Sequence, residues 1–175
     1  MTDPDTAYDN GKHVADSADH PPRWATEAAA FRAALGDRAQ TGLAYGAGNR
    51  QRFDLFRPEG ADRGTVIFIH GGYWRRFDRD LWSHFAAGPL ARGWAVAMPS
   101  YDLCPDVRIT DITGQIARAV TAVADRTEGP ITITGHSAGG HLTARMTDAA
   151  LLLPSVAARV RMAPDLAPVR SSSAD

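Results

Sequence analysis

Cysteine and net charge are the two things this sequence has least of. It has a single cysteine, Cys104, which cannot form an internal disulfide. This excludes the class of small secreted domains held together by disulfides and favours a reducing compartment, so we expect a cytoplasmic protein. Nineteen Lys and Arg residues stand against 20 Asp and Glu residues, which gives a formal net charge of -1. That balance offers no attraction to nucleic acid or to an anionic membrane, so the expected partner is a small molecule.

Long apolar runs are also missing. No uninterrupted run is long enough to cross a bilayer, and residues 1–20 contain no apolar segment of the kind found in export signals. These 20 residues show no hydrophobic periodicity, and we predict that they form a flexible N-terminal arm. No group of His, Cys or acidic residues has metal-ligand spacing, so we expect no metal and no cofactor. The hydrophobic content of 44% is enough for one core, which predicts a single domain over residues 21–175.

Strand and helix patterns alternate along that domain. Strands are predicted at 41–45, 51–56, 64–70, 94–98 and 130–134, with a last candidate at 158–163. Helices are predicted at 24–35, 80–92, 109–123 and 140–150. The first two strands flank the turn 46–49 and are typical of an antiparallel hairpin, whereas the later strands are apolar or β-branched runs typical of a buried parallel sheet. The order predicts an α/β fold, a mostly parallel sheet with helices on both faces.

Three of the helix predictions carry further detail. The first helix is expected to follow Pro21-Pro22 and to end at Gly36. The second should turn Leu81, Phe85 and Leu90 inward and kink at Gly88-Pro89. The third has the clearest amphipathic spacing, with an apolar stripe made by Ile109, Ile112, Ile116, Val120 and Val123.

The stretch Gly135-His136-Ser137-Ala138-Gly139 organises the chain, because it has the Gly-x-Ser-x-Gly pattern of a nucleophile elbow. A strand is predicted before it and a helix after it, so the turn between them holds Ser137 in a strained conformation. Its neighbours must then be small, which Gly135 and Gly139 satisfy. The alternative interpretation is a glycine-rich turn between a strand and a helix without chemistry.

A second loop fits the same chemistry. His70-Gly71-Gly72 follows the predicted strand 64–70, where small residues can present backbone N–H groups to a developing oxyanion. In the α/β-hydrolase architecture one such donor belongs to the residue after the nucleophile, here Ala138, and another to the loop after the third strand. Both pieces occur in the expected order, each on its expected element.

Four motifs narrow the resemblance: His70–Trp74, Trp82–His84, Met98–Tyr101 and Gly135–Leu142. Together they resemble the kynurenine formamidase (arylformamidase) branch of the esterase and lipase-like hydrolases over most of residues 24–163. The resemblance implies that Ser137 is the nucleophile, and that Gly72, Tyr73 and Ala138 supply oxyanion N–H groups. His70, Gly71, Gly135 and Gly139 would support the loop and the elbow. The implied reaction is hydrolysis of an N-formyl arylamine or of a small carboxylic ester.

The acid and base of the triad have no clear counterpart. In this fold they follow the serine in the order Asp or Glu, then His. The last histidine, His141, falls one helical turn beyond Ser137, below the nucleophile rather than across from it. Asp165 follows the last candidate strand, but Pro164 beside it favours a turn residue. We therefore expect the C-terminal strands of the fold to be missing from this sequence.

Several alternatives stay open. The chain is an enzyme completed by residues not present here, an inactive remnant or ligand-binding module of the same fold, or a complete small hydrolase with an unorthodox dyad. Tyr73 and Trp74 either line an aromatic substrate pocket or fill the core. Among the remaining candidates, His70 is expected to brace its loop, His84 and His136 to pack or lie on the surface, and Cys104 to take no part.

Overall fold

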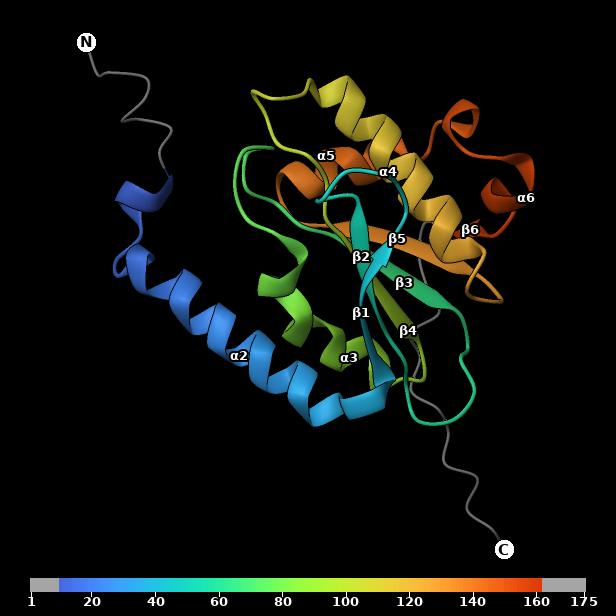
Figure 1. The fold of residues 1–175 in the computed structure, drawn as a ribbon, viewed down its shortest axis with the longest axis horizontal. Helices are drawn as coiled ribbons and strands as arrows, with labels where there is room; N and C mark the ends of the chain where they lie inside the picture. Colours follow the sequence, from blue (N-terminus) through green and yellow to red (C-terminus); the bar gives the residue numbers. More distant parts are fainter. Residues whose placement is uncertain (1–9, 162–175) are drawn as a thin grey trace, which may run out of the picture.

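The computed structural model describes residues 10–161 of the chain, and its centre is a six-stranded sheet in the order β1-β2-β4-β3-β5-β6 (Figure 1). The strands are β1 Ala39–Ala44, β2 Arg52–Phe56, β3 Thr65–Ile69, β4 Ala95–Pro99, β5 Ile131–Gly135 and β6 Val160–Arg161. Strands β4, β3, β5 and β6 are parallel, whereas β2 is antiparallel to both β1 and β4. The predicted mostly parallel sheet with an opening antiparallel hairpin is confirmed.

The α-helices are α2 His20–Leu35, α3 Ala87–Leu90, α4 Ile109–Ala124, α5 Ala138–Arg145 and α6 Pro154–Ala157. The 3-10 helices are η1 Asn10–His13, η2 Ser17–Asp19, η3 Gly36–Arg38, η4 Arg79–Ala86 and η5 Ala149–Leu151. Within residues 10–161, no helix has the length and apolar character needed to span a membrane.

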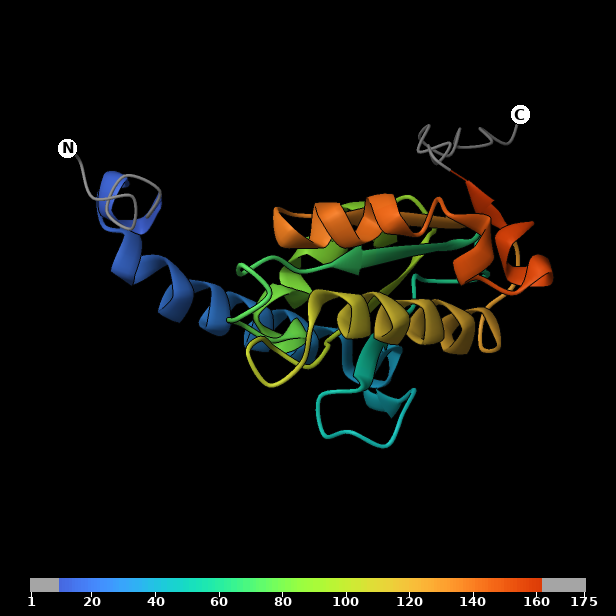
Figure 2. The same cartoon turned by 90° about the horizontal axis from the view of Figure 1, so that it is seen from above.

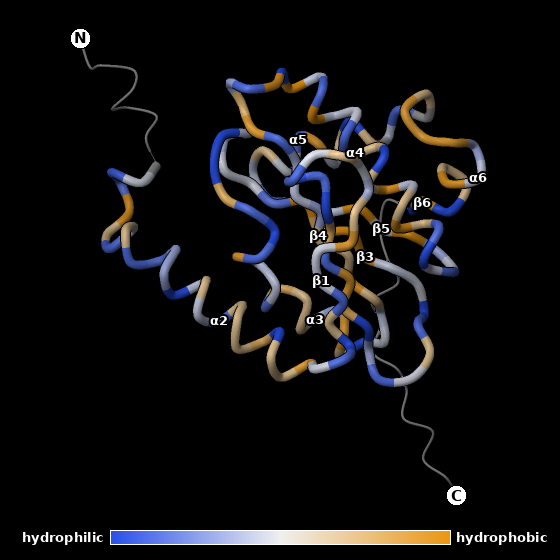
Figure 3. Tube along the Cα trace, in the orientation of Figure 1, coloured by the Kyte–Doolittle hydropathy of each residue, from blue (hydrophilic) through white to orange (hydrophobic). Residues whose placement is uncertain are grey.

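Alternate strand residues face two separate hydrophobic layers. In β3, Ile67 and Ile69 belong to a core that also contains the buried faces of α4, α5 and α6. Val66 and Phe68 belong to the opposite layer, which packs beneath α2, η4 and α3. Successive side chains of a strand point to opposite faces, so these apolar runs require cover on both sides. Figure 3 shows the result as hydrophobic central strands surrounded by more hydrophilic loops.

The beginning of the domain differs from the prediction. Helix α2 starts at His20 and includes both prolines in its first turn, where their missing N–H groups need no acceptor. Residues 10–19 form two 3-10 helices instead of an irregular arm, and residues 1–9 lie outside the described residues. The first turns of α2 extend past the sheet, as Figures 1 and 2 both show.

The helix predicted at 80–92 was wrong in type and at one of its three inward positions, since Leu90 is buried and Leu81 packs against the core layer as predicted. The segment is the 3-10 helix η4 followed by the single turn α3, and Gly88-Pro89 lies within that turn. Phe85, expected inside, is 46% exposed, whereas Trp82 is 4% exposed. The tighter 3-10 winding moves each side chain relative to its position in an α-helix, and the large Trp82 ring takes the buried place.

The end of the domain also differs in part. Helix α5 stops at Arg145 and is shorter than predicted, and the turn α6 was not anticipated. The predicted strand 158–163 is present as β6, parallel to β5, while its positions 162 and 163 fall outside the described residues. Helix α4 confirms the amphipathic pattern, except that Ile109 at its first turn is 38% exposed.

A buried ion pair joins the hairpin to the first residue of η4. The Asp54 side chain on β2 is 2% exposed, and its Oδ1 lies 2.9 Å from Nε of Arg79. The same oxygen accepts a hydrogen bond from the Gly42 backbone N–H at 2.8 Å. Arg79 Nη1 also donates to Ser100 Oγ at 2.9 Å, beyond the end of β4. One carboxylate therefore holds β1, β2 and η4 together.

We expect Asp54→Ala to lower the free energy of unfolding by about 3 kcal/mol, because it leaves the largely buried Arg79 without its main partner. The measurement is urea denaturation followed by circular dichroism. The matched control is Glu59→Ala, which breaks the Arg38–Glu59 pair in which the Glu59 side chain is 88% exposed. An exposed pair of this kind contributes less than about 0.5 kcal/mol. Equal losses in the two variants would contradict the structural role of Asp54.

Candidate active site

The turn between β5 and α5 has the geometry of the predicted elbow. Ser137 has φ 53° and ψ -118°, and it directly precedes the first residue of α5. A positive φ costs energy for any residue with a Cβ atom, so the surrounding structure must maintain it. A Cβ atom added to Gly135 would lie 2.4 Å from the Gly139 carbonyl oxygen, which explains the first glycine of the motif.

The loop after β3 presses directly against this elbow. A Cβ atom on Gly139 would lie 2.0 Å from the carbonyl oxygen of Ile69, and one on Gly71 would lie 3.1 Å from Cβ of Ser137. The His136 backbone N–H donates to the Ile69 carbonyl at 3.1 Å. The fold therefore brings together the two motifs that the sequence placed far apart. The catalytic roles given to their residues stay predictions.

The same loop carries unusual backbone strain. Tyr73, Trp74 and Phe77 have φ values of 54°, 57° and 73°, and Gly72 has 115°. The N–H groups of Arg75 and Arg76 both donate to the Gly72 carbonyl, at 2.9 and 3.0 Å, which tightens the turn. Of the five non-glycine residues with positive φ in the described part of the chain, four lie in this loop or at Ser137. Strain concentrated in this way is typical of functional sites.

His70 braces the loop in the way the sequence suggested. Its ring is 1% exposed and stacks on Tyr101, with ring centroids 4.4 Å apart. Nδ1 lies 2.7 Å from the Gly71 carbonyl, which can only accept, so Nδ1 carries the proton. The Tyr101 hydroxyl donates to the His70 carbonyl at 2.9 Å. Burial lowers the pKa of His70 to about 4, so the ring is neutral near pH 7.

The part of the chain that the structure describes offers Ser137 no base. No side chain in residues 10–161 makes a hydrogen bond with its hydroxyl. His141 lies one turn along α5, and its backbone N–H donates to the Ser137 carbonyl. Its exposed ring is nearly perpendicular to the ring of Trp74, with the two ring centroids 5.4 Å apart. Asp165 lies outside the described residues. Residues 10–161 also contain no group of three or more potential metal ligands.

Tyr73 and Trp74 have different surroundings. The centroid of the Tyr73 ring lies 5.7 Å from the guanidinium carbon of Arg76, and the residue is 43% exposed. Trp74 is half-buried and packs against the core layer beneath α4. Its predicted place in a substrate pocket stays a prediction.

An aromatic cavity of about 560 Å³ lies beside the elbow. One side is formed by residues between Gly11 and Trp24, and the other by Gly72, Arg76, Phe77, Trp82 and His136. The sequence analysis missed this cavity, because it left residues 1–20 out of the domain. The available signal was the Trp82-Ser83-His84 motif, which counted toward the family resemblance but received no role.

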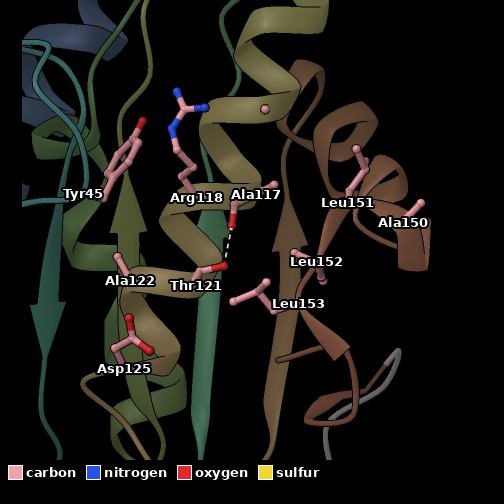
Figure 4. A pocket seen from close by; sticks show the side chains of 11 residues that line it. Tyr45, Ala117, Arg118, Thr121, Ala122, Asp125, Ala150, Leu151, Leu152 and Leu153 are labelled. Carbon is pink, nitrogen blue, oxygen red and sulfur yellow. Dashed lines mark hydrogen bonds between the residues drawn. The ribbon is translucent and has the colours of Figure 1, made fainter. Parts of the chain in front are cut away.

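A second cavity, of about 640 Å³, lies between α4 and residues 150–153 (Figure 4). Figure 4 shows Tyr45 and Arg118 on one side of it and Ala150 and Leu151 on the other, and Thr121 Oγ1 donates to the Ala117 carbonyl at 3.1 Å. None of the elbow residues 135–139 lines this cavity. It is therefore distinct from the candidate active site.

Comparison with known proteins identifies similar chains. A model of the alpha/beta hydrolase family matches residues 66–174. Kynurenine formamidase of Drosophila melanogaster is 37% identical over 121 residues, which cover 65% of this chain and 38% of that enzyme. Kynurenine formamidase of Salmo salar is 33% identical over 105 residues, covering 57% of this chain and 35% of that one.

Two solved structures are also similar to this chain. The crystal structure of a candidate thioesterase from Silicibacter sp. TM1040 is 57% identical, with a TM-score of 0.87, and the match covers 89% of this chain and 60% of that one. Esterase B of Lactobacillus rhamnosis is 29% identical, with a TM-score of 0.53, over 71% of this chain and 46% of that one. The chain thus spans between about a third and three fifths of the length of these relatives.

We expect Gly139→Ala and Gly140→Ala to change stability in opposite directions. The methyl group at 139 collides with the backbone of Ile69, so the two loops must separate, at a cost of about 3 kcal/mol. At 140 the nearest atom to an added Cβ is the Gly135 carbonyl oxygen at 3.6 Å, an ordinary contact. Alanine there gains about 0.5 to 1 kcal/mol of helix propensity. Thermal and urea denaturation of both variants measure the difference, and similar effects would contradict the contact.

We also expect His70 to make stability depend on pH. Above pH 6.5 the ring is neutral in both the folded and unfolded states and has no effect. Between pH 6.5 and about pH 4, His70 is protonated in the unfolded chain but stays neutral in the folded protein. The free energy of unfolding therefore falls progressively as the pH is lowered through this range. The full loss is about 3 kcal/mol.

His70→Gln does not titrate, so it should flatten this dependence. His141→Gln, at an exposed position, is the control and should leave it unchanged. Urea denaturation at a series of pH values between 4 and 7 tests both. A wild-type slope that survives in His70→Gln would show that another group is responsible.

Proposed function

Because the chain belongs to the alpha/beta hydrolase family, we propose that it is a serine hydrolase acting on a small carboxylic ester or an N-formyl arylamine. The observation that carries the proposal is the strained Ser137 backbone at a strand-to-helix turn, held in contact with the glycine loop after β3. Neither a structural turn nor a simple binding loop requires a serine at this φ, where glycine is less strained.

The proposed first step is addition of Ser137 Oγ to the carbonyl carbon of the substrate. The hydroxyl proton passes to a general base, and the carbonyl π electrons move onto oxygen as the tetrahedral intermediate forms. The N–H groups of Gly72, Tyr73 and Ala138 would hold that oxyanion. Ala138 is the first residue of α5, and the first N–H groups of a helix have no intrahelical acceptor. In α5 the N–H groups of Gly139 and Gly140 donate to the His136 and Ser137 carbonyls, whereas that of Ala138 has no acceptor within residues 10–161 and is available to a ligand.

Collapse of the intermediate expels the alcohol or arylamine, which takes up a proton, and leaves the acyl or formyl group on Ser137. Water then releases that group and restores the serine. His70 contributes by position only, because its buried neutral ring holds Gly71 through Nδ1. The proposed mechanism also needs a triad acid and base, and no side chain in residues 10–161 is hydrogen-bonded to the Ser137 hydroxyl. We propose that residues outside this range supply them.

The substrate class follows from the relatives. The fly and salmon proteins are kynurenine formamidases, and esterase B acts, by its name, on esters. Formamides and esters share a carbonyl attacked by an activated serine, so one elbow and one set of oxyanion donors serve both. The alternative of an inactive binding module has no observation of its own in residues 10–161.

We expect a fluorophosphonate probe to label Ser137 slowly, because the elbow and oxyanion donors are present while no neighbouring base is described. Ser137→Ala should abolish labelling, as measured by intact-protein mass spectrometry. The matched control is Ser155→Ala in the exposed first turn of α6, which should leave the rate unchanged. Undiminished labelling of Ser137→Ala would remove the basis of the proposed function.

A further inference from the structure

The cavity beside the elbow is built from three stretches of the chain that are distant in the sequence. His136 directly precedes Ser137, and Gly72 is one of the proposed oxyanion donors; both line the cavity. The opposite wall is the segment Gly11–Trp24, which comprises η1, η2 and the first turn of α2. A substrate bound at Ser137 would therefore place one of its substituents against this N-terminal wall.

The two walls meet through a chain of aromatic rings. His20 stacks on Trp24 at 5.7 Å, and Trp24 lies 5.2 Å from Trp82 across the junction. Trp82 in turn lies 6.1 Å from His136 and 5.9 Å from Phe77. Rings at these separations present flat apolar surface together with polarised edges, which suits another aromatic ring.

Trp82 contributes its ring rather than its indole N–H to this surface. Its side chain is buried, and the indole nitrogen has almost no accessible surface and no acceptor among the residues that the structure describes. The surface that the cavity offers to a ligand here is therefore aromatic and apolar.

Trp24 lines this cavity together with His20 and Pro21, and other residues of α2 also anchor the helix. Arg32 Nη1 donates to Ser83 Oγ at 2.7 Å, and Phe31 meets Phe56 edge-on, with ring centroids 6.1 Å apart. These contacts hold the helix to the body in addition to Trp24, whose ring packs on Trp82 and lines the cavity.

We propose that the segment Gly11–Trp24 is a wall of the substrate pocket, and that Trp24 gives the pocket its preference for an aromatic group. This inference rests on the proposed function, since it makes the pocket a part of that hydrolytic site. It assigns specificity to a part of the chain outside the two motifs that carry the chemistry.

Equilibrium binding of two unreactive ligands tests the pocket. N-phenylmethanesulfonamide carries a ring and acceptor oxygens, and N-propylmethanesulfonamide replaces the ring with an alkyl chain. We expect the wild type to bind the phenyl compound more tightly, as measured by ligand-observed NMR. Trp24→Ala should weaken phenyl binding about tenfold and leave propyl binding nearly unchanged, whereas Trp24→Phe should retain most of the preference.

Phe31→Leu is the matched control, because it alters an aromatic contact of the same helix away from the cavity. It should leave the phenyl preference intact. A preference that persists in Trp24→Ala, or an equal loss in Phe31→Leu, would overturn the proposal. Should Trp24→Ala fail to fold, Ala18→Trp tests the same wall by filling the cavity. It should weaken phenyl binding, and unchanged binding would overturn the proposal equally.

Labelling of Ser137 separates this inference from the proposed function. Ser137→Ala should retain phenyl binding, because the pocket does not depend on the hydroxyl. Phenyl selectivity that depends on Trp24, together with labelling that is insensitive to Ser137→Ala, would leave the pocket in place and refute the serine mechanism. If labelling requires Ser137 but Trp24→Ala has no effect on phenyl selectivity, the proposed role of Gly11–Trp24 as a wall of the substrate pocket is refuted.

Discussion

The contact between the backbones of the two site loops is the constraint on which the rest of this structure depends. β3 and β5 pair in parallel register, with Ile69 opposite Gly135, so both strands end at the same edge of the sheet. The chains leaving that edge are so close that the Ile69 carbonyl occupies the space of a Cβ atom at Gly139. Glycine at 139 is therefore a steric requirement. The position of Ser137 is set by the pairing of β3 with β5 and by the close approach of the loops that follow them, not by contacts of its own side chain.

Two side-chain contacts fix the elements around these loops. The Asp54–Arg79 ion pair joins the hairpin to η4, and the hydrogen bond from Arg32 to Ser83 joins α2 to η4. The 3-10 helix η4 is thus fixed from both sides, which places Trp82 under the elbow. The candidate site consequently draws on three stretches of the chain that are remote in sequence. Only two of them bear recognisable motifs.

The sequence predicted the sheet, the hairpin, helix α4 and the elbow, because each depends on local periodicity or on a short motif with strict steric needs. It did not predict η4, since the inward or outward position of Phe85 and Trp82 is decided by ring packing against other elements. The N-terminal wall was missed for a related reason. Residues 10–19 have no periodicity, and their arrangement depends on contacts with a loop that begins more than fifty positions later. The meeting of His70–Gly72 with Ser137 was anticipated only through the resemblance to a known fold.

The backbone of the loop after β3 has a consequence for engineering. Tyr73, Trp74 and Phe77 adopt φ values that glycine would accept more readily, and each such residue costs on the order of 1 kcal/mol or more. A selection for thermal stability alone would therefore tend to replace them, relaxing the loop that presses on the elbow. A library screened for melting temperature would then lose the loop geometry on which the proposed hydrolytic site depends. Stability and that geometry make opposite demands on the same three residues.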